Sequence, residues 1–108
     1  MIAEHVSEQA LAAGGFGTSQ AGERWVSLGP VTIANATAVL ESTRAMPLPS
    51  SGVVDLVALH PVDSAAVALL LSIKRRALAE GKPLTFVNIT PSLHTLADLY
   101  GVEDLLTA

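Results

Sequence analysis

Apolar and polar positions over residues 52–60 follow the pattern of a buried β-strand. The segment G-V-V-D-L-V-A-L-H is β-branched and almost continuously apolar, which is typical of a strand covered on at least one face. We therefore expect it to lie centrally in a sheet. R-W-V-S-L-G at 24–29 predicts an earlier strand, with Trp25 and Ser27 on one face. Gly29-Pro30 then turns the chain, and V-T-I at 31–33 predicts a short second strand.

Helical patterns alternate with these strands. Asn35 is a candidate N-cap for a helix over 36–45. A longer helix is expected to follow Asp63 and to run to about Glu80, with Gly81 as its left-handed end.

The C-terminal part of the chain repeats this alternation. P-L-T-F-V-N-I at 83–89 predicts a strand, and Thr90-Pro91 is a helix start with threonine as cap and proline at the first helical position. The apolar face of that helix comprises Leu93, Leu96, Ala97 and Tyr100. Gly101 should end it, before a last short helix in V-E-D-L-L. The order β-β-α-β-α-β-α predicts an α/β sandwich with too few strands for a dinucleotide-binding fold.

The helix after Asp63 has two contrasting arcs at 100° per residue. The apolar arc should face the sheet and comprises Ala66, Val67, Leu70, Ile73, Ala77 and Leu78. The opposite arc is nearly flat and comprises Ala65, Ala68, Ser72, Arg75, Arg76 and Ala79. Small residues let another backbone come close, and arginines at the margin can pair with a partner's carboxylates. This arc is either a docking face or a run of alanines present because alanine is the best helix former.

An acid and a hydroxyl stand together at the start of this helix. A carboxylate just before a helix, such as Asp63, accepts amide hydrogen bonds and lies at the positive end of the helix dipole. Ser64 falls in the first turn, where capping does not need its hydroxyl. The hydroxyl is therefore free to contact a partner or to accept a phosphate. No G-x-S-x-G motif surrounds it, and the nearest base, His60, lies at a strand end, so a hydrolytic nucleophile is not expected.

Composition narrows the class of protein. The chain has 108 residues, 50% of them apolar and 4% aromatic, which predicts one domain with an aliphatic core. It has no cysteine, which excludes disulfides and thiolate metal sites. The net charge of −4 argues against general nucleic-acid binding. No apolar stretch reaches the ~18 residues of a membrane span, and the N-terminus lacks the basic start of a signal peptide. We therefore expect a cytoplasmic domain that does not insert into the membrane.

The sequence contains no recognisable catalytic or metal-binding constellation. His5 and His94 are isolated, and no pair of His or acidic residues has metal-ligand spacing. No phosphate-binding loop of the form G-x-x-x-x-G-K-[ST] is present. We therefore expect a non-catalytic chain with no metal and no cofactor of its own.

Two segments carry a family resemblance. They are V-D-S-A-A-V-A-L-L-L at 62–71, which follows the apolar strand, and T-L-A-D-L-Y-G-V-E-D-L-L at 95–106. With the strand between them they resemble STAS domains, which occur in anti-sigma factor antagonists, in sulfate transporter tails and in a subunit of the Mla phospholipid ABC transporter. The resemblance covers about residues 24–108, and the glycine-containing segment 1–23 is expected to be a flexible lead-in. It implies a STAS-like sandwich, a small mixed β-sheet with helices packed mainly on one face.

Two branches of this family differ in the position of the functional hydroxyl. Anti-sigma factor antagonists typically carry D-S-S-G or D-S-T-G and are phosphorylated on the residue before the glycine. That residue corresponds to Ala65, which cannot take a phosphate, and Ala66 stands in place of the glycine. The Mla subunit resembles D-[ST]-x-G-L-A-L-L, with the hydroxyl directly after the aspartate, where Ser64 falls. The closing L-A-x-L-Y-x-[LV] segment also resembles that branch.

Resemblance to the Mla branch implies a non-catalytic cytoplasmic subunit. It would dock on the ATPase of the ABC transporter that maintains outer-membrane lipid asymmetry, and would reach the inner membrane only through that partner. The implied partner-binding or switch residues are Asp63, Ser64, Ala65, Ala68, Ser72, Arg75 and Arg76. An anti-sigma factor antagonist in a partner-switching pathway, with or without nucleotide binding, stays open as the alternative. Homodimer formation also stays open.

Overall fold

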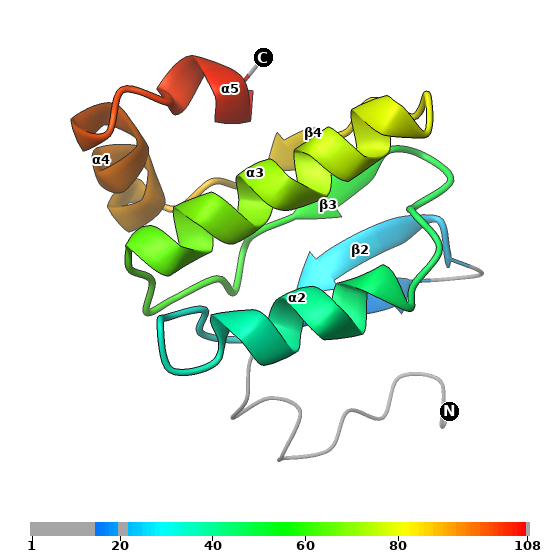
Figure 1. The fold of residues 1–108 in the computed structure, drawn as a ribbon, viewed down its shortest axis with the longest axis horizontal. Coiled ribbons are helices and arrows are strands. Elements are labelled where there is room, and N and C mark those ends of the chain that lie inside the picture. Colours follow the sequence, from blue (N-terminus) through cyan, green and yellow to red (C-terminus); the bar gives the residue numbers. More distant parts are fainter. Residues whose placement is uncertain (1–14, 20–21, 108) are drawn as a thin grey trace.

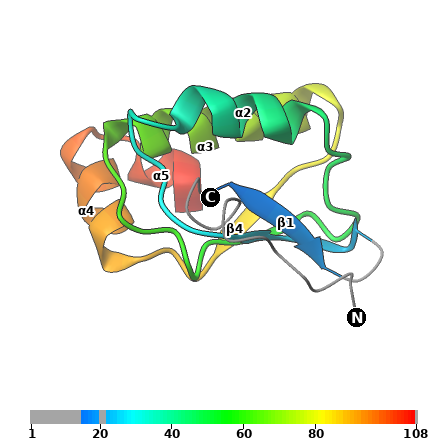
Figure 2. The ribbon, with the colours of Figure 1, turned by 90° about the horizontal axis from the view of Figure 1, so that it is seen from below.

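The computed structural model describes residues 15–19 and 22–107 and arranges them in two layers. One layer is a sheet of β1 (Phe16–Ser19), β2 (Arg24–Ser27), β3 (Val53–Asp55) and β4 (Thr85–Val87). The helices are α2 (Ala36–Arg44), α3 (Ser64–Ala79), α4 (Pro91–Leu99) and α5 (Glu103–Thr107). Figure 1 shows α2 and α3 side by side, and Figure 2 shows both on the same side of the sheet. The predicted α/β sandwich, with helices packed mainly on one face, is confirmed.

The sheet is mixed and has the order β1-β2-β3-β4. β1 and β2 pair antiparallel, whereas β2–β3 and β3–β4 pair parallel. Parallel neighbours need a crossover connection, which α2 and α3 supply in turn. β3 lies between two strands, as its apolar sequence predicts. Its ladder spans Val53–Asp55 and so uses only part of the predicted segment 52–60.

A row of apolar side chains crosses the helix-facing side of the sheet. Trp25, Val54 and Phe86 are register partners on three neighbouring strands, and all three are buried. Trp25 Nε1 donates to the carbonyl of Pro47 at 3.1 Å, so the polar atom of this large core side chain has a partner. Burying apolar side chains such as these favours the folded state.

The predicted strand at 31–33 does not form. Val31 makes only an isolated bridge to Val62. Asn35 Oδ1 then accepts a hydrogen bond from Thr32 N at 2.9 Å, and this side chain-to-backbone bond turns the chain into α2. Asn35 does occupy the N-cap position of α2, but its side chain bonds backward rather than to the helix. Three alternating residues do not distinguish a strand from such a turn.

A strand that the sequence pattern did not predict takes the place of 31–33. β1, with the sequence F-G-T-S, lies inside the expected lead-in 1–23. Its glycine and hydroxyl residues give no strong strand signal, and the strand exists because it pairs with β2 and buries Phe16 against Trp25. Residues 1–14 and 20–21 of that lead-in lie outside the described part of the chain.

Several helix ends agree with their sequence signals. Thr90 Oγ1 accepts from Leu93 N, with Pro91 at the first helical position of α4. Gly81 and Gly101 have φ angles of 72° and 70° and follow the ends of α3 and α4. The short α5 also lies where V-E-D-L-L predicts it.

Two side chains predicted to face the core are exposed. Leu78 is 62% exposed and Tyr100 is 51% exposed. Both lie at the C-terminal ends of their helices, past the part that packs on the core. Leu69, which the predicted arc omits, is only 3% exposed. The predicted arc omitted Leu69 because it assumes one packing partner, whereas α3 also packs beside α2 and turns Leu69 toward it.

Candidate functional site

Asp63 connects the start of α3 to the loop before α2. Its Oδ1 accepts from Ala65 N at 2.8 Å, which confirms the predicted N-cap. Its Oδ2 accepts from Ile33 N at 2.9 Å. One carboxylate therefore satisfies backbone amides on two segments that are distant in the sequence. The second bond positions Ile33 beside the start of α3.

Ser64 is the first residue of α3, and its side chain is exposed. Its hydroxyl makes no hydrogen bond to any residue that the structure describes. Asp63 already provides the cap, so the Ser64 hydroxyl has no structural role at this helix end. It is available to a group from outside the chain.

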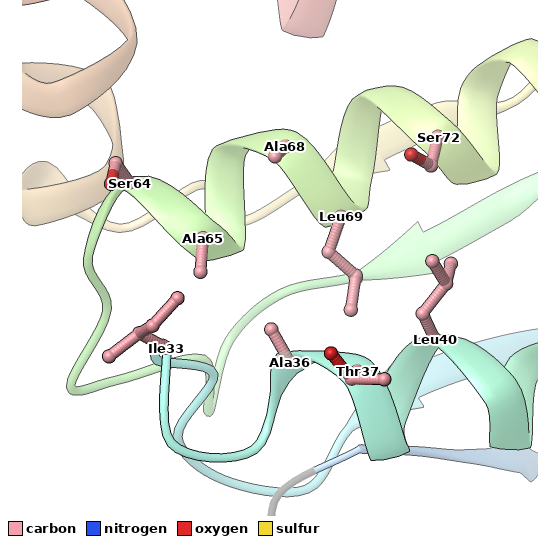
Figure 3. A pocket seen from close by; sticks show the side chains of 9 residues that line it. All are labelled: Ile33, Ala36, Thr37, Leu40, Ser64, Ala65, Ala68, Leu69 and Ser72. Atoms are coloured by element: carbon pink, nitrogen blue, oxygen red, sulfur yellow. The ribbon is translucent and has the colours of Figure 1, made fainter.

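A groove of about 330 Å³ runs between α2 and α3. Its α3 wall consists of Ser64, Ala65, Ala68, Leu69 and Ser72, and its opposite wall of Ile33, Ala36, Thr37 and Leu40. Figure 3 shows Ala65 and Leu69 pointing from α3 toward the loop and α2, with Ser64 at one end of the groove and Ser72 toward the other. We call this surface the α2–α3 groove. Its walls are mainly apolar and small, with hydroxyls along the edge, which suits close approach of another protein backbone.

Arg76 has an internal role that the sequence analysis did not foresee. Its Nη1 and Nη2 donate to the carbonyls of Thr43 and Met46, each at 2.8 Å, and its Nε lies 2.9 Å from Glu80 Oε2. The guanidinium thus covers the C-terminal end of α2, where the helix carries partial negative charge. Arg76 therefore joins α3 to α2, and its role as a partner contact stays a prediction.

Four other members of the predicted flat arc lie on two different sides of α3. Ala65, Ala68 and Ser72 line the α2–α3 groove. Arg75 instead lines a second groove, on the side of α3 that faces α5. The flat arc is therefore not one surface. Helical periodicity places these residues on the outer side of α3 but does not say which neighbouring elements flank them.

Five of the nine residues that line the α2–α3 groove were not predicted as site residues, namely Ile33, Ala36, Thr37, Leu40 and Leu69. Ile33 is 83% exposed, a high value for an isoleucine, and stands at the edge of the groove. Ala36, Thr37 and Leu40 add one face of the first turns of α2. Ala36 and Thr37 precede Leu40 by four and three residues, and this spacing along one helix face is the signal that could have found them.

Other polar residues form no reactive cluster in the described part of the chain. His94 is not isolated, because its Nδ1 lies 3.0 Å from Glu103 Oε2 at the exposed α4–α5 junction. His60 is exposed, and His5 lies outside the described residues. Within the described ranges, no three His, Cys, Asp or Glu side chains are grouped so as to hold a metal ion. None of the helices described is both long and apolar enough to cross a membrane.

The fold and the α2–α3 groove define a small α/β domain with a surface suited to protein binding. A family model described as the MlaB STAS domain matches residues 24–107. The chain belongs to this family. STAS domains are generally non-catalytic, which indicates an accessory or regulatory role. A comparison with curated proteins finds no matching relative.

Proposed function

We propose that the chain is a non-catalytic subunit that docks on the ATPase of a Mla-type phospholipid ABC transporter through the α2–α3 groove. The observation that carries this proposal is the exposed hydroxyl of Ser64 at one end of that groove, which bonds to none of the residues that the structure describes. It stands directly after the capping aspartate, where the Mla branch has its functional hydroxyl. Membership of the MlaB STAS family supports the choice of branch.

The groove has the features that a docking surface needs. Ala65 and Ala68 leave room for a partner's side chains, and Ile33 offers apolar area that is otherwise in contact with water. Ser64 supplies a hydrogen bond that fixes orientation. The chain would then lie on the cytoplasmic side of the inner membrane, held there by its partner.

An anti-sigma factor antagonist is the alternative function. In that class the phosphorylated position corresponds to Ala65, which has no hydroxyl and whose methyl group lines the groove. No feature of the described residues favours this alternative over docking on a transporter ATPase. The binding experiment distinguishes the two functions.

The experiment measures binding of the purified chain to the purified ATPase subunit of a Mla-type transporter. Ser64→Ala should weaken binding by ~1 kcal/mol, or about fivefold, the usual net contribution of one hydrogen bond. Ser64→Glu should weaken it by more than tenfold, because a carboxylate would be buried against a surface shaped for a hydroxyl. Ala68→Arg should weaken it similarly by filling the groove.

Ser92 provides a matched control, because it is an exposed serine in the first turn of another helix, α4. Ser92→Ala and Ser92→Glu should bind like the wild type, and all variants should melt within a few degrees of it. Equal capture of every variant would remove the α2–α3 groove from the interface. Phosphorylation of an Ala65→Ser variant by an anti-sigma kinase, without capture of the ATPase, would favour the alternative.

A further inference from the structure

A second groove lies on the other side of α3 and is apolar with a basic edge. It has a volume of about 390 Å³ and is lined by Leu71, Leu78, Leu84 and Leu105, with Lys74 and Arg75 among its other walls. We call it the α3–α5 groove. Leu78 and Leu105 are 62% and 55% exposed. Single exposed leucines need no explanation, but two in one apolar groove indicate a contact surface.

The two basic residues of this groove are held differently. Lys74 Nζ donates to the carbonyl of Leu105 at 2.5 Å and lies 5.7 Å from the centre of the Phe86 ring. Burial there lowers the pKa of Lys74 from its ordinary value. Arg75 is exposed and makes no ion pair with any residue that the structure describes. Its guanidinium is available to a carboxylate from outside.

The C-terminal end of α4 has the complementary character. Leu99 is 72% exposed and Tyr100 is 51% exposed, so two consecutive large side chains are exposed at this helix end. Asp98, Glu103 and Asp104 line a small hollow beside them. Asp98 and Asp104 form no ion pair within the described part of the chain, whereas Glu103 pairs with His94. We call Asp98–Tyr100 with Asp104 the α4 tip; it is apolar with an acidic edge.

The tip and the groove lie on either side of α5. α5 begins three residues after Tyr100, and its Leu105 forms part of the groove. Figure 1 shows α4, α5 and the C-terminal end of α3 in this order along one edge of the molecule. A two-fold axis beside α5 would therefore bring the tip of each copy to the groove of the other.

We propose that two copies of this chain associate about such an axis, with Leu99 and Tyr100 of each copy in the α3–α5 groove of its partner. Apolar surface meets apolar surface, and Arg75 of each copy faces the acidic edge of the other tip. The contact is isologous and closes at two copies, because both patches are used on both chains. It does not rest on the proposed function, since the α2–α3 groove lies on the opposite side of α3.

The mass of the full chain in solution tests this proposal, measured by light scattering or sedimentation over about 1 μM to 1 mM, the range of moderate affinities. The wild type should pass from monomer to dimer as concentration rises. Leu99→Lys places a cation against the basic groove, and Leu78→Glu places an anion against the acidic tip. Each variant alone should stay monomeric where the wild type is dimeric. An equimolar mixture of the two should recover dimers, because one wild-type contact and one Lys–Glu contact then form.

Val57→Glu is the matched control, because Val57 is 56% exposed and lines neither groove. It should dimerise like the wild type. A wild type that stays monomeric at the highest concentration overturns the proposal, as does one whose mass grows beyond two copies. Variants that still dimerise alone, or a mixture that stays monomeric, also overturn it. If either variant melts early, Arg75→Glu and Asp98→Lys repeat the same mixing experiment at exposed charged positions.

Discussion

A single carboxylate holds together the two segments that begin the α2–α3 groove. Asp63 gives one oxygen to Ala65 N and the other to Ile33 N, at 2.8 and 2.9 Å. A helix cap is a local feature that a short sequence motif encodes. The bond to Ile33 depends on the fold, because it joins the loop before α2 to the start of α3. The same residue therefore shapes the groove as well as the helix.

Substitution of Asp63 measures how much its two hydrogen bonds stabilise the fold. Asp63→Ala should lower the free energy of unfolding by about 1 to 2 kcal/mol, since an N-cap is lost and two amides lose their partner. Asp63→Asn should lose less, because the amide keeps one acceptor oxygen and asparagine is a good N-cap. Urea unfolding measures both, with Ser64→Ala as the neighbouring control that should change little. A fully stable Asp63→Ala would contradict this account of the helix start.

At the scale of elements, α2 and α3 are joined at both ends of the groove they form. Asp63 acts near the start of α3, and Arg76 acts near its end by donating to the carbonyl of Thr43 in α2 and that of Met46 just after it. Between these points the helices stand apart enough to leave the groove. The width of the groove thus depends on two polar links as well as on packing.

Arg76 and Arg75 form a natural pair for testing the second link. Arg76→Ala should destabilise the chain by about 1 to 3 kcal/mol, because the charged hydrogen bonds to Thr43 O and Met46 O are lost. Arg76→Lys should fall between, since an ammonium keeps the charge but not the planar fork. Arg75→Ala, one residue away and exposed, should change the unfolding free energy by less than about 0.5 kcal/mol. Equal effects of the two alanine variants on the unfolding free energy would show that the hydrogen bonds of Arg76 to Thr43 O and Met46 O do not stabilise the chain.

At the scale of the whole molecule, the candidate sites formed by the described residues are surface grooves. α3 is flanked by two grooves with different chemistry: one edged with hydroxyls beside α2, the other edged with basic groups beside α5. Each carboxylate oxygen of Asp63 accepts a hydrogen bond from a backbone amide. Among the described side chains, no base forms a hydrogen bond with the Ser64 hydroxyl. Such a molecule is suited to joining other chains.

The purified chain should therefore hydrolyse neither ATP nor GTP. Release of inorganic phosphate is the measurement, compared with a preparation purified in the same way from cells without the gene. Ser64→Ala and Asp63→Asn serve as the paired variants. Turnover above the blank that either substitution abolishes would contradict the proposed non-catalytic role and would make this pair an active site.

Structural features that depend on a few neighbouring residues were predicted correctly from the sequence. The cap at Asp63, the Thr90-Pro91 start and the glycine ends at Gly81 and Gly101 all depend on local hydrogen bonds or local backbone conformation. Long periodic segments were also reliable, since the apolar arc of α3 is buried apart from Leu78. The exposed position of Ser64 follows from that same local reading.

Features that join distant parts of the chain were decided only by the tertiary structure. β1 forms because it pairs with the edge of β2. The segment 31–33 forms a turn because the Thr32 amide donates to Asn35 and the Ile33 amide donates to Asp63. Arg76 lies in the predicted outer arc, yet its guanidinium donates hydrogen bonds to backbone carbonyls at the C-terminal end of α2 and just after it. The sequence by itself determined where helices begin and end and which residue stands exposed after the cap. Only the packing of α2 beside α3 made that residue the end of a groove, because a groove needs two walls and periodicity describes one.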